Sequence, residues 1–431
     1  MRKSEKRHWS LGRSVLEMVS GVAAVALSVA IYATPAFAIE GASSLNPVGS
    51  GARAAGMGGA FIATADDATA ASWNPAGLVH LEKPEFSLVY GYFNRDQSFS
   101  SGVHPEVSGN DQSMNADGIN YASVAVPFTL FGKNVVTSLN YQRLIDMNKS
   151  YGIPTYNFDP TTQMNNFKYS QNGYLSTISP AFAIQVMPEL YVGVALNIWN
   201  DFLGASSWES TQEGDIPLAG GLFRNKYKYT FSGLNATVGA LVNLDKLSIG
   251  AVVKSPFNAT IHQKDIGGGG MPDKKETWKM PMSVGLGLAY RFSDKFSSSI
   301  DAYWTQWSAS VWKDFIGAEW NPIAGDLTAN VGKPDDTTSV RLGAEYLFIN
   351  DKSVIPVRAG LFYDPQPGFK KVDDYYGFSL GSGYTYQKYS FDIAYQLRKG
   401  NNISAPEIVA DGTVTSTTMQ HTVLTSFIYR F

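Results

Sequence analysis

The chain is dominated by segments in which apolar and polar residues alternate at every second position. One such segment runs from 234 to 244 and another from 247 to 253, with only Asp245 and Lys246 between them. Alternation with a period of two predicts β-strands, and the two-residue connection predicts a tight hairpin. Comparable segments continue to the last residue, Phe431, and together they predict about 14 strands.

This pattern fits either a soluble sandwich with its apolar face inward or a membrane barrel with its apolar face outward. Strands of about ten residues match a tilted membrane crossing. Short turns such as Gln387-Lys388 alternate with long polar stretches, as at the two ends of an outer-membrane barrel. The long stretches are predicted to be loops at 94–117, 144–171, 200–224, 258–277, 308–336 and 398–416. We therefore predict an all-β fold, a transmembrane antiparallel β-barrel over 85–431, in which closure removes exposed strand edges.

Residues 1–38 have the pattern of a cleaved export signal. Basic residues precede a mostly apolar stretch over 15–31, and Ala36-Phe37-Ala38 matches a cleavage site. The rest of the chain has no run of 18 apolar residues and predicts no spanning helix. We expect the protein in the outer membrane of a Gram-negative bacterium. Its aromatic C-terminal strand, ending at Phe431, is then the expected contact for the barrel assembly machinery.

Composition narrows the chemistry that the chain can perform. The formal net charge is −3, which does not favour a nucleic-acid partner. There is no cysteine, so stability must come from packing and hydrogen bonds. The histidines after residue 38 show neither a zinc-ligand spacing nor a serine motif beside them; they are His80, His104, His262 and His421. We predict no cofactor, no metal site and no enzyme activity.

Residues 39–84 differ from the rest because they show little alternation and are rich in Gly and Ala. Small residues let a backbone pack closely against a barrel wall. Asp66 or Asp67 is predicted to cap a short helical turn, and the run Asn74, Pro75, Ala76 and Gly77 predicts a tight turn. We predict an N-terminal hatch inside the lumen, with these last four residues as the gating residues.

The stretch from Gly51 to Leu78, GARAAGMGGAFIATADDATAASWNPAGL, resembles the N-terminal hatch of the FadL family of outer-membrane transporters, including its Asn-Pro-Ala motif. Later segments resemble strands of that family in the same order; they are PMSVGLG at 281–287, DAYWTQWS at 301–308, RLGAEY at 341–346 and RAGLFYD at 358–364. The resemblance covers the chain after the export signal. It implies a monomeric 14-stranded barrel, closed by the hatch, that passes hydrophobic molecules by passive diffusion.

The resemblance also implies a hydrophobic capture groove between the third and fourth extracellular loops, about 200–223 and 258–278. A hatch movement or a lateral opening in the wall would then release the ligand. Apolar residues in the third loop either bind ligand or pack against one another; the candidates are Phe202, Leu203, Trp208, Leu222 and Phe223. Basic residues at its end either attract a carboxylate or lie near lipopolysaccharide; they are Arg224, Lys226 and Lys228.

The favoured function is passive uptake of long-chain fatty acids, and the alternative cargo is a monoaromatic hydrocarbon such as toluene. The expected surroundings are outer-membrane lipid and lipopolysaccharide. Two other classes of barrel place different demands on the sequence. A general porin needs a wide polar lumen, and an outer-membrane lipolytic enzyme needs a serine and a histidine together at the barrel wall.

Overall fold

The computed structural model describes residues 44–431 apart from 47, 110, 160–161, 202–205, 217–220, 324–332, 369–370, 406–407 and 409–412. The predicted export signal and its cleavage site lie outside these residues. In this part of the chain, no helix is long and apolar enough to cross a membrane.

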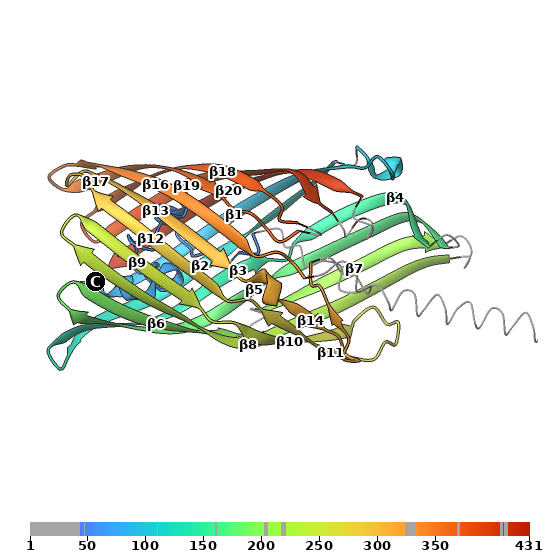
Figure 1. Cartoon of the computed structure of the whole chain (residues 1–431), viewed down its shortest axis with the longest axis horizontal. Coiled ribbons are helices and arrows are strands. Elements are labelled where there is room, and N and C mark those ends of the chain that lie inside the picture. The colour runs from blue at the N-terminus through green and yellow to red at the C-terminus, as the bar shows by residue number, and fades with distance from the viewer. Residues whose placement is uncertain are drawn as a thin grey trace, which may run out of the picture.

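Fourteen antiparallel strands of the described chain close into a barrel (Figure 1). The first strand pairs with the last from Glu85 opposite Arg430 to Ser100 opposite Thr415, so the wall has no free edge there. The barrel strands are β1 (Glu85–Ser100), β2 (Asp111–Leu130), β3 (Lys133–Asp146), β5 (Thr162–Met187), β6 (Leu190–Trp199), β8 (Gly221–Leu244), β9 (Leu247–Lys254), β12 (Ser283–Arg291), β13 (Phe296–Thr305), β16 (Thr337–Ile349), β17 (Ser353–Tyr363), β18 (Tyr375–Tyr386), β19 (Tyr389–Ser404) and β20 (Thr415–Arg430). The predicted transmembrane barrel and its strand number are confirmed.

Apolar side chains of the barrel strands face outward. Along β12, Leu286 is 60% exposed and Leu288 is 47% exposed, while Gly285 and Gly287, which alternate with them, lie against the interior. A soluble sandwich would bury these leucines. The outward apolar belt is therefore the surface that contacts lipid.

Beyond the barrel, six shorter strands continue the sheet at the end opposite the C-terminus (Figure 1). The long strands β5 and β8, of 26 and 24 residues, run from the barrel into this part. The added strands are β4 (Lys149–Asp159), β7 (Ser206–Ile216), β10 (Phe257–Asp265), β11 (Lys274–Met280), β14 (Val311–Lys313) and β15 (Glu319–Trp320). Outer-membrane barrels have short periplasmic turns and long extracellular connections, so this part lies outside the cell. We call it the extracellular extension.

The extracellular extension corrects the prediction of long polar loops. Strands occupy much of the predicted loops 94–117, 144–171, 200–224 and 258–277, and β19 and β20 cover both ends of 398–416. In addition, the predicted strand at 234–244 is the second half of the longer strand β8. Outside the membrane no lipid forces one face of a strand to be apolar. The alternation on which the prediction rests is therefore weak in these strands.

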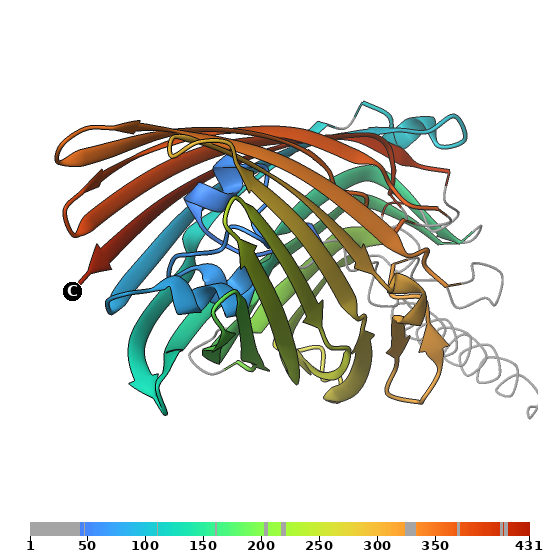
Figure 2. The ribbon, with the colours of Figure 1, turned by 60° about the vertical axis from the view of Figure 1, so that its left-hand side comes forward.

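Residues 44–84 lie inside the barrel, where the ribbon winds between the walls (Figure 2). We call this stretch the lumen segment. It contains three short helices, α2 (Ala52–Gly56), α3 (Ala70–Trp73) and the 3₁₀ helix η1 (Pro75–His80). Two further 3₁₀ turns lie in outer connections, η2 (Pro105–Val107) and η5 (Trp307–Ala309).

Candidate functional site

Glycines in the barrel wall let the lumen segment pack directly on the wall backbone. A Cβ at Gly360 would lie 2.2 Å from the amide nitrogen of Gly58, and one at Gly343 would lie 2.4 Å from the carbonyl oxygen of Met57. Further round the wall, a Cβ at Gly193 would lie 2.4 Å from the carbonyl carbon of Pro75. These wall positions have no room for a side chain while the segment is in place.

Hydrogen bonds from wall side chains hold the backbone of the lumen segment. Asp301 of β13 accepts the amide protons of Phe61 and Ile62 at 2.6 and 2.8 Å. Ser379 of β18 accepts from the amide of Gly58 at 2.8 Å, and Ser426 of β20 accepts from that of Ala52 at 2.7 Å. These bonds give partners to buried amides of an irregular segment, and the amide of Gly58 has a second acceptor in the carbonyl oxygen of Ala55 at 3.1 Å.

Asn74 joins two turns of the lumen segment to the wall. Its side-chain amide donates to the carbonyl oxygens of Ile62 at 3.0 Å and Ala240 at 3.1 Å, and its Oδ1 accepts from the amide of Ala76 at 3.2 Å. The last contact caps η1, whose first residue is Pro75. Asn74 is fully buried, and a Cβ at Gly239 would lie 2.0 Å from its Oδ1.

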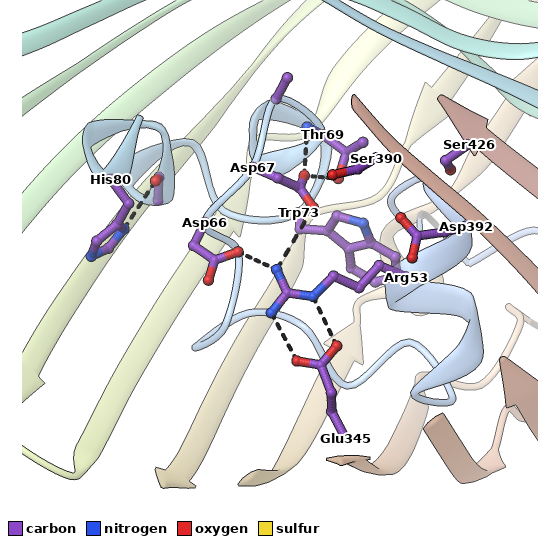
Figure 3. Close-up of polar contacts among 12 residues, drawn as sticks. Arg53, Asp66, Asp67, Thr69, Trp73, His80, Glu345, Ser390, Asp392 and Ser426 are labelled. Atoms are coloured by element: carbon purple, nitrogen blue, oxygen red, sulfur yellow. Dashed lines mark hydrogen bonds and ion pairs between the residues drawn. The ribbon is translucent and has the colours of Figure 1, made fainter. Parts of the chain in front are cut away.

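A chain of ion pairs connects Arg53 of α2 with three wall strands, and Figure 3 shows its first links, from Arg53 to Glu345 and to Asp66. Arg53 donates to both carboxylate oxygens of Glu345, at 3.1 and 3.2 Å, and it also pairs with Asp66. Glu345 accepts from Arg358 at 2.6 Å, and Arg358 in turn donates to Asp392 at 2.6 Å. A bidentate pair with little water around it holds its geometry well. We call Arg53, Asp66, Glu345, Arg358 and Asp392 the Arg53 cluster.

The predicted helix cap at Asp66 or Asp67 is wrong, because Thr69 is the N-cap residue of α3 and makes no side-chain capping hydrogen bond. Asp67 instead forms a turn ahead of the helix. Its Oδ1 accepts from the amide of Thr69 at 2.8 Å and from the Thr69 hydroxyl at 2.6 Å, just ahead of α3. Burial raises the pKa of Asp67 above that of an ordinary aspartate, although the guanidinium of Arg53 acts in the other direction.

Asp364, which directly follows β17, fixes the start of the lumen segment. Its carboxylate accepts from the side-chain amide of Asn46 at 3.2 Å and pairs with Arg341 at 3.2 Å and Arg398 at 3.1 Å. Burial alone would raise the pKa of Asp364. The two guanidinium groups outweigh this effect and lower that pKa below its ordinary value.

An aromatic cavity of about 60 Å³ lies in the part of the lumen next to the extracellular extension. Its walls include Trp199, Phe257 and Trp307, and Leu45 of the lumen segment contributes to its lining. Trp199 stacks on Phe257 with a centroid distance of 5.6 Å. Among the described lining residues, Lys254 is the one ionisable group. The cavity therefore combines aromatic and aliphatic side chains with several neutral polar groups and a single basic side chain.

Two more cavities lie along the lumen. One of about 170 Å³ shares Gln142 and Leu144 with the aromatic cavity. The other, of about 310 Å³, lies at the short turns of the periplasmic end and includes Arg53 and His80 in its lining. The second and third cavities share no lining residue, because the lumen segment separates them.

The two predicted groove residues whose side chains are described lie on different strands, Trp208 on β7 and Leu222 on β8. Trp208 is buried and stacks on Tyr229 at 4.8 Å, within the aromatic cluster of the extracellular extension. Leu222 is 88% exposed. Phe202 and Leu203 lie outside the described residues, as does the side chain of Phe223. Strands β7, β10 and β11 lie in the described part of the two loops.

The predicted basic residues lie on the outward face of β8. Their neighbours Tyr227 and Tyr229 lie on the other face, among the aromatic side chains of the extension, and side chains alternate along a strand. Arg224 pairs with Glu213 at 2.9 Å and Lys226 with Glu209 at 2.7 Å, while Lys228 is exposed. These residues therefore face away from the aromatic cavity, and the basic side chain that lines it is Lys254.

The wall partners of the lumen segment were not identified from the sequence. Glu345, Arg358 and Asp392 are spread over three strands and form one cluster only after the barrel closes. The sequence does carry a signal for the close contact at the wall glycines. The similar strand motifs RLGAEY at 341–346 and RAGLFY at 358–363 each have a glycine at an inward position.

A closed barrel with an outward apolar belt and its own N-terminal segment in the lumen defines a class of outer-membrane protein. The sequence profile of the family described as "Outer membrane protein transport protein (OMPP1/FadL/TodX)" matches residues 29–431. The chain belongs to this family, whose members carry hydrophobic compounds across the outer membrane, and it is an outer-membrane protein. A search of curated protein sequences finds no significant match.

Solved structures of transporters share this fold. A FadL homologue of Pseudomonas aeruginosa aligns with 90% of this chain and 100% of its own, at 15% identity and a TM-score of 0.60. The P. putida toluene transporter TodX aligns over 90% and 99%, at 14% identity and 0.55. The Ralstonia pickettii toluene transporter TbuX aligns over 90% and 99%, at 16% identity and 0.52. These family members and structural neighbours are transporters or channels, not enzymes.

Proposed function

We propose that the protein passes long-chain fatty acids across the outer membrane by passive diffusion. The observation that carries this proposal is the aromatic cavity with Lys254 in its wall. An aliphatic chain gains about 25 cal/mol per Å² of apolar surface removed from water. The Lys254 ammonium group can pair with a carboxylate head, which a purely apolar cavity would not accommodate.

The lumen segment acts as a hatch in this proposal. The aromatic cavity is small, about 60 Å³, and the lumen segment forms one side of it. Leu45, Ala71 and Ser72 form part of its lining, so a movement of the lumen segment enlarges it. Release of the Arg53 cluster and of the turn at Asn74, Pro75, Ala76 and Gly77 would join the three cavities into one path.

The alternative cargo is a monoaromatic hydrocarbon such as toluene. The stacked walls of the cavity, Trp199 and Phe257, favour a flat aromatic ligand as well. Such a ligand has no carboxylate and no use for Lys254. The two cargoes therefore differ in their dependence on this one residue.

The test is uptake of labelled oleate and labelled toluene by cells that express Lys254→Met, Lys254→Arg or the unchanged protein. We expect Lys254→Met to reduce oleate uptake about tenfold, from loss of a charged hydrogen bond. Lys254→Arg should retain it, and toluene uptake should not change. The matched control is Lys279→Met, because Lys279 is exposed on the outward face of β11. Equal oleate uptake by all variants would overturn the role of Lys254.

A further inference from the structure

The outward face of the extracellular extension brings cations directly opposite one another. In the register of β8 and β10, Lys228 lies opposite Lys264, and in that of β10 and β11, His262 lies opposite Lys275. All four side chains are exposed. We call Lys228, Lys264, Lys275 and His262 the basic face.

The sheet supplies no anion to most of the basic face. On the other side of β8, Glu209 of β7 lies opposite Lys228, but its carboxylate pairs with Lys226 at 2.7 Å, and Glu213 pairs with Arg224. Within the described residues, no carboxylate forms an ion pair with Lys228, Lys264 or Lys275 within 4 Å. Like charges at opposite cross-strand positions destabilise a sheet. Such an arrangement is relieved when an external anion binds across the strands.

The position of the basic face relative to the membrane indicates the source of this anion. Lower on the same face of β8, Leu234 and Val238 belong to the exposed apolar belt that contacts lipid. Six residues of strand separate Leu234 from Lys228, which is about 20 Å along the strand and about 15 Å along the membrane normal after tilt. The basic face therefore begins where the polar part of the outer leaflet lies.

We infer that the basic face binds the phosphate groups of lipopolysaccharide in the outer leaflet. Ammonium groups recognise phosphate as point charges, and a juxtamembrane basic patch attracts an anionic lipid surface. Three ammonium groups on adjacent strands suit a head group that carries several phosphates. This site faces away from the aromatic cavity and does not depend on the transported cargo.

The experiment compares lipopolysaccharide binding by purified protein variants in detergent micelles. The test variant is Lys228→Gln/Lys264→Gln/Lys275→Gln. The control, Lys246→Gln/Lys295→Gln/Lys388→Gln, loses the same charge from exposed residues at periplasmic turns, far from the basic face. We expect the test variant to bind about tenfold more weakly than the unchanged protein and the control to bind nearly normally. Heat-modifiable gel mobility verifies that each barrel is folded.

Two further probes identify the ligand chemistry. Dephosphorylated lipopolysaccharide should bind the unchanged protein as weakly as intact lipopolysaccharide binds the test variant. Inorganic phosphate at the same phosphate concentration should not displace intact lipopolysaccharide from the unchanged protein, because the lipid presents several phosphates together. Equal binding by test and control variants, undiminished binding of the dephosphorylated lipid, or full displacement by inorganic phosphate would each overturn the assignment.

Discussion

Asn74 is the residue whose replacement we expect to weaken most the contact between the lumen segment and the barrel wall. Replacement by Ala removes the donor to the buried carbonyl oxygen of Ile62, at a cost of about 1–3 kcal/mol, and also the donor to the part-buried carbonyl oxygen of Ala240. We expect Asn74→Ala to make the lumen segment accessible to protease at a lower denaturant concentration. Asn134→Ala is the matched control because its hydrogen bond to Gln185 is exposed. Identical protection in the two variants would contradict this role.

Asp364 gives the start of the lumen segment a defined response to acid. Its pKa is lowered in the folded protein, so the native state binds this proton less readily than the unfolded chain does. The stability it contributes is therefore present above the unfolded pKa and is lost as pH falls through the lowered one. We expect a fluorescent probe at position 44 to become mobile on acidification below about pH 4. In Asp364→Asn, the same probe should already be mobile at neutral pH; an unchanged acid response in that variant would refute the assignment.

At the scale of elements, the wall glycines determine whether the lumen segment fits. A valine at Gly360 would force its side chain into the backbone of Met57 and Gly58. We predict that Gly360→Val still assembles as a barrel but displaces the segment, so conductance in planar bilayers rises. Gly102→Ala serves as the control, because a Cβ there meets nothing within 4 Å. A Gly360→Val barrel with unchanged conductance would show that the segment packs elsewhere.

The Arg53 cluster is the predicted latch between α2 and strands β16, β17 and β19. Arg53→Ala leaves Glu345 paired with Arg358 but removes the ionic link from the segment to the wall. We expect more frequent opening in single-channel recordings, with the folded barrel retained. Arg291→Ala is the control, since its pair with Asp245 is 3.8 Å long and exposed. Equal opening in the two variants would exclude a latch at Arg53.

The sequence prediction was accurate for elements in which the surroundings fix the pattern of apolar and polar residues. Lipid requires an apolar outward face, so strands such as β12, with Leu286 and Leu288, could be predicted from alternation alone. Outside the membrane this constraint disappears, and β7, β10 and β11 were predicted as loops. The candidate site was less predictable still, because Lys254 lines the aromatic cavity with residues from distant strands.

At the scale of the whole molecule, the described part of the N-terminal segment lies between cavities of the lumen. The aromatic cavity lies toward the extracellular extension, and the cavity of about 310 Å³ opens among the periplasmic turns. A general porin would keep a wide polar passage between these ends. The filled lumen instead suits a channel that opens when a hydrophobic ligand binds and shifts the population toward the open state.

The central claim is that this filled barrel passes hydrophobic molecules, with fatty acids as the favoured cargo. The most direct measurement is uptake of labelled oleate, toluene and a hydrophilic sugar, side by side, in cells with and without the protein. We predict that the protein increases oleate uptake and leaves sugar uptake unchanged. Uptake of toluene alone would replace the fatty acid with the aromatic cargo. An increase for the sugar alone, or for none of the three, would contradict the claim.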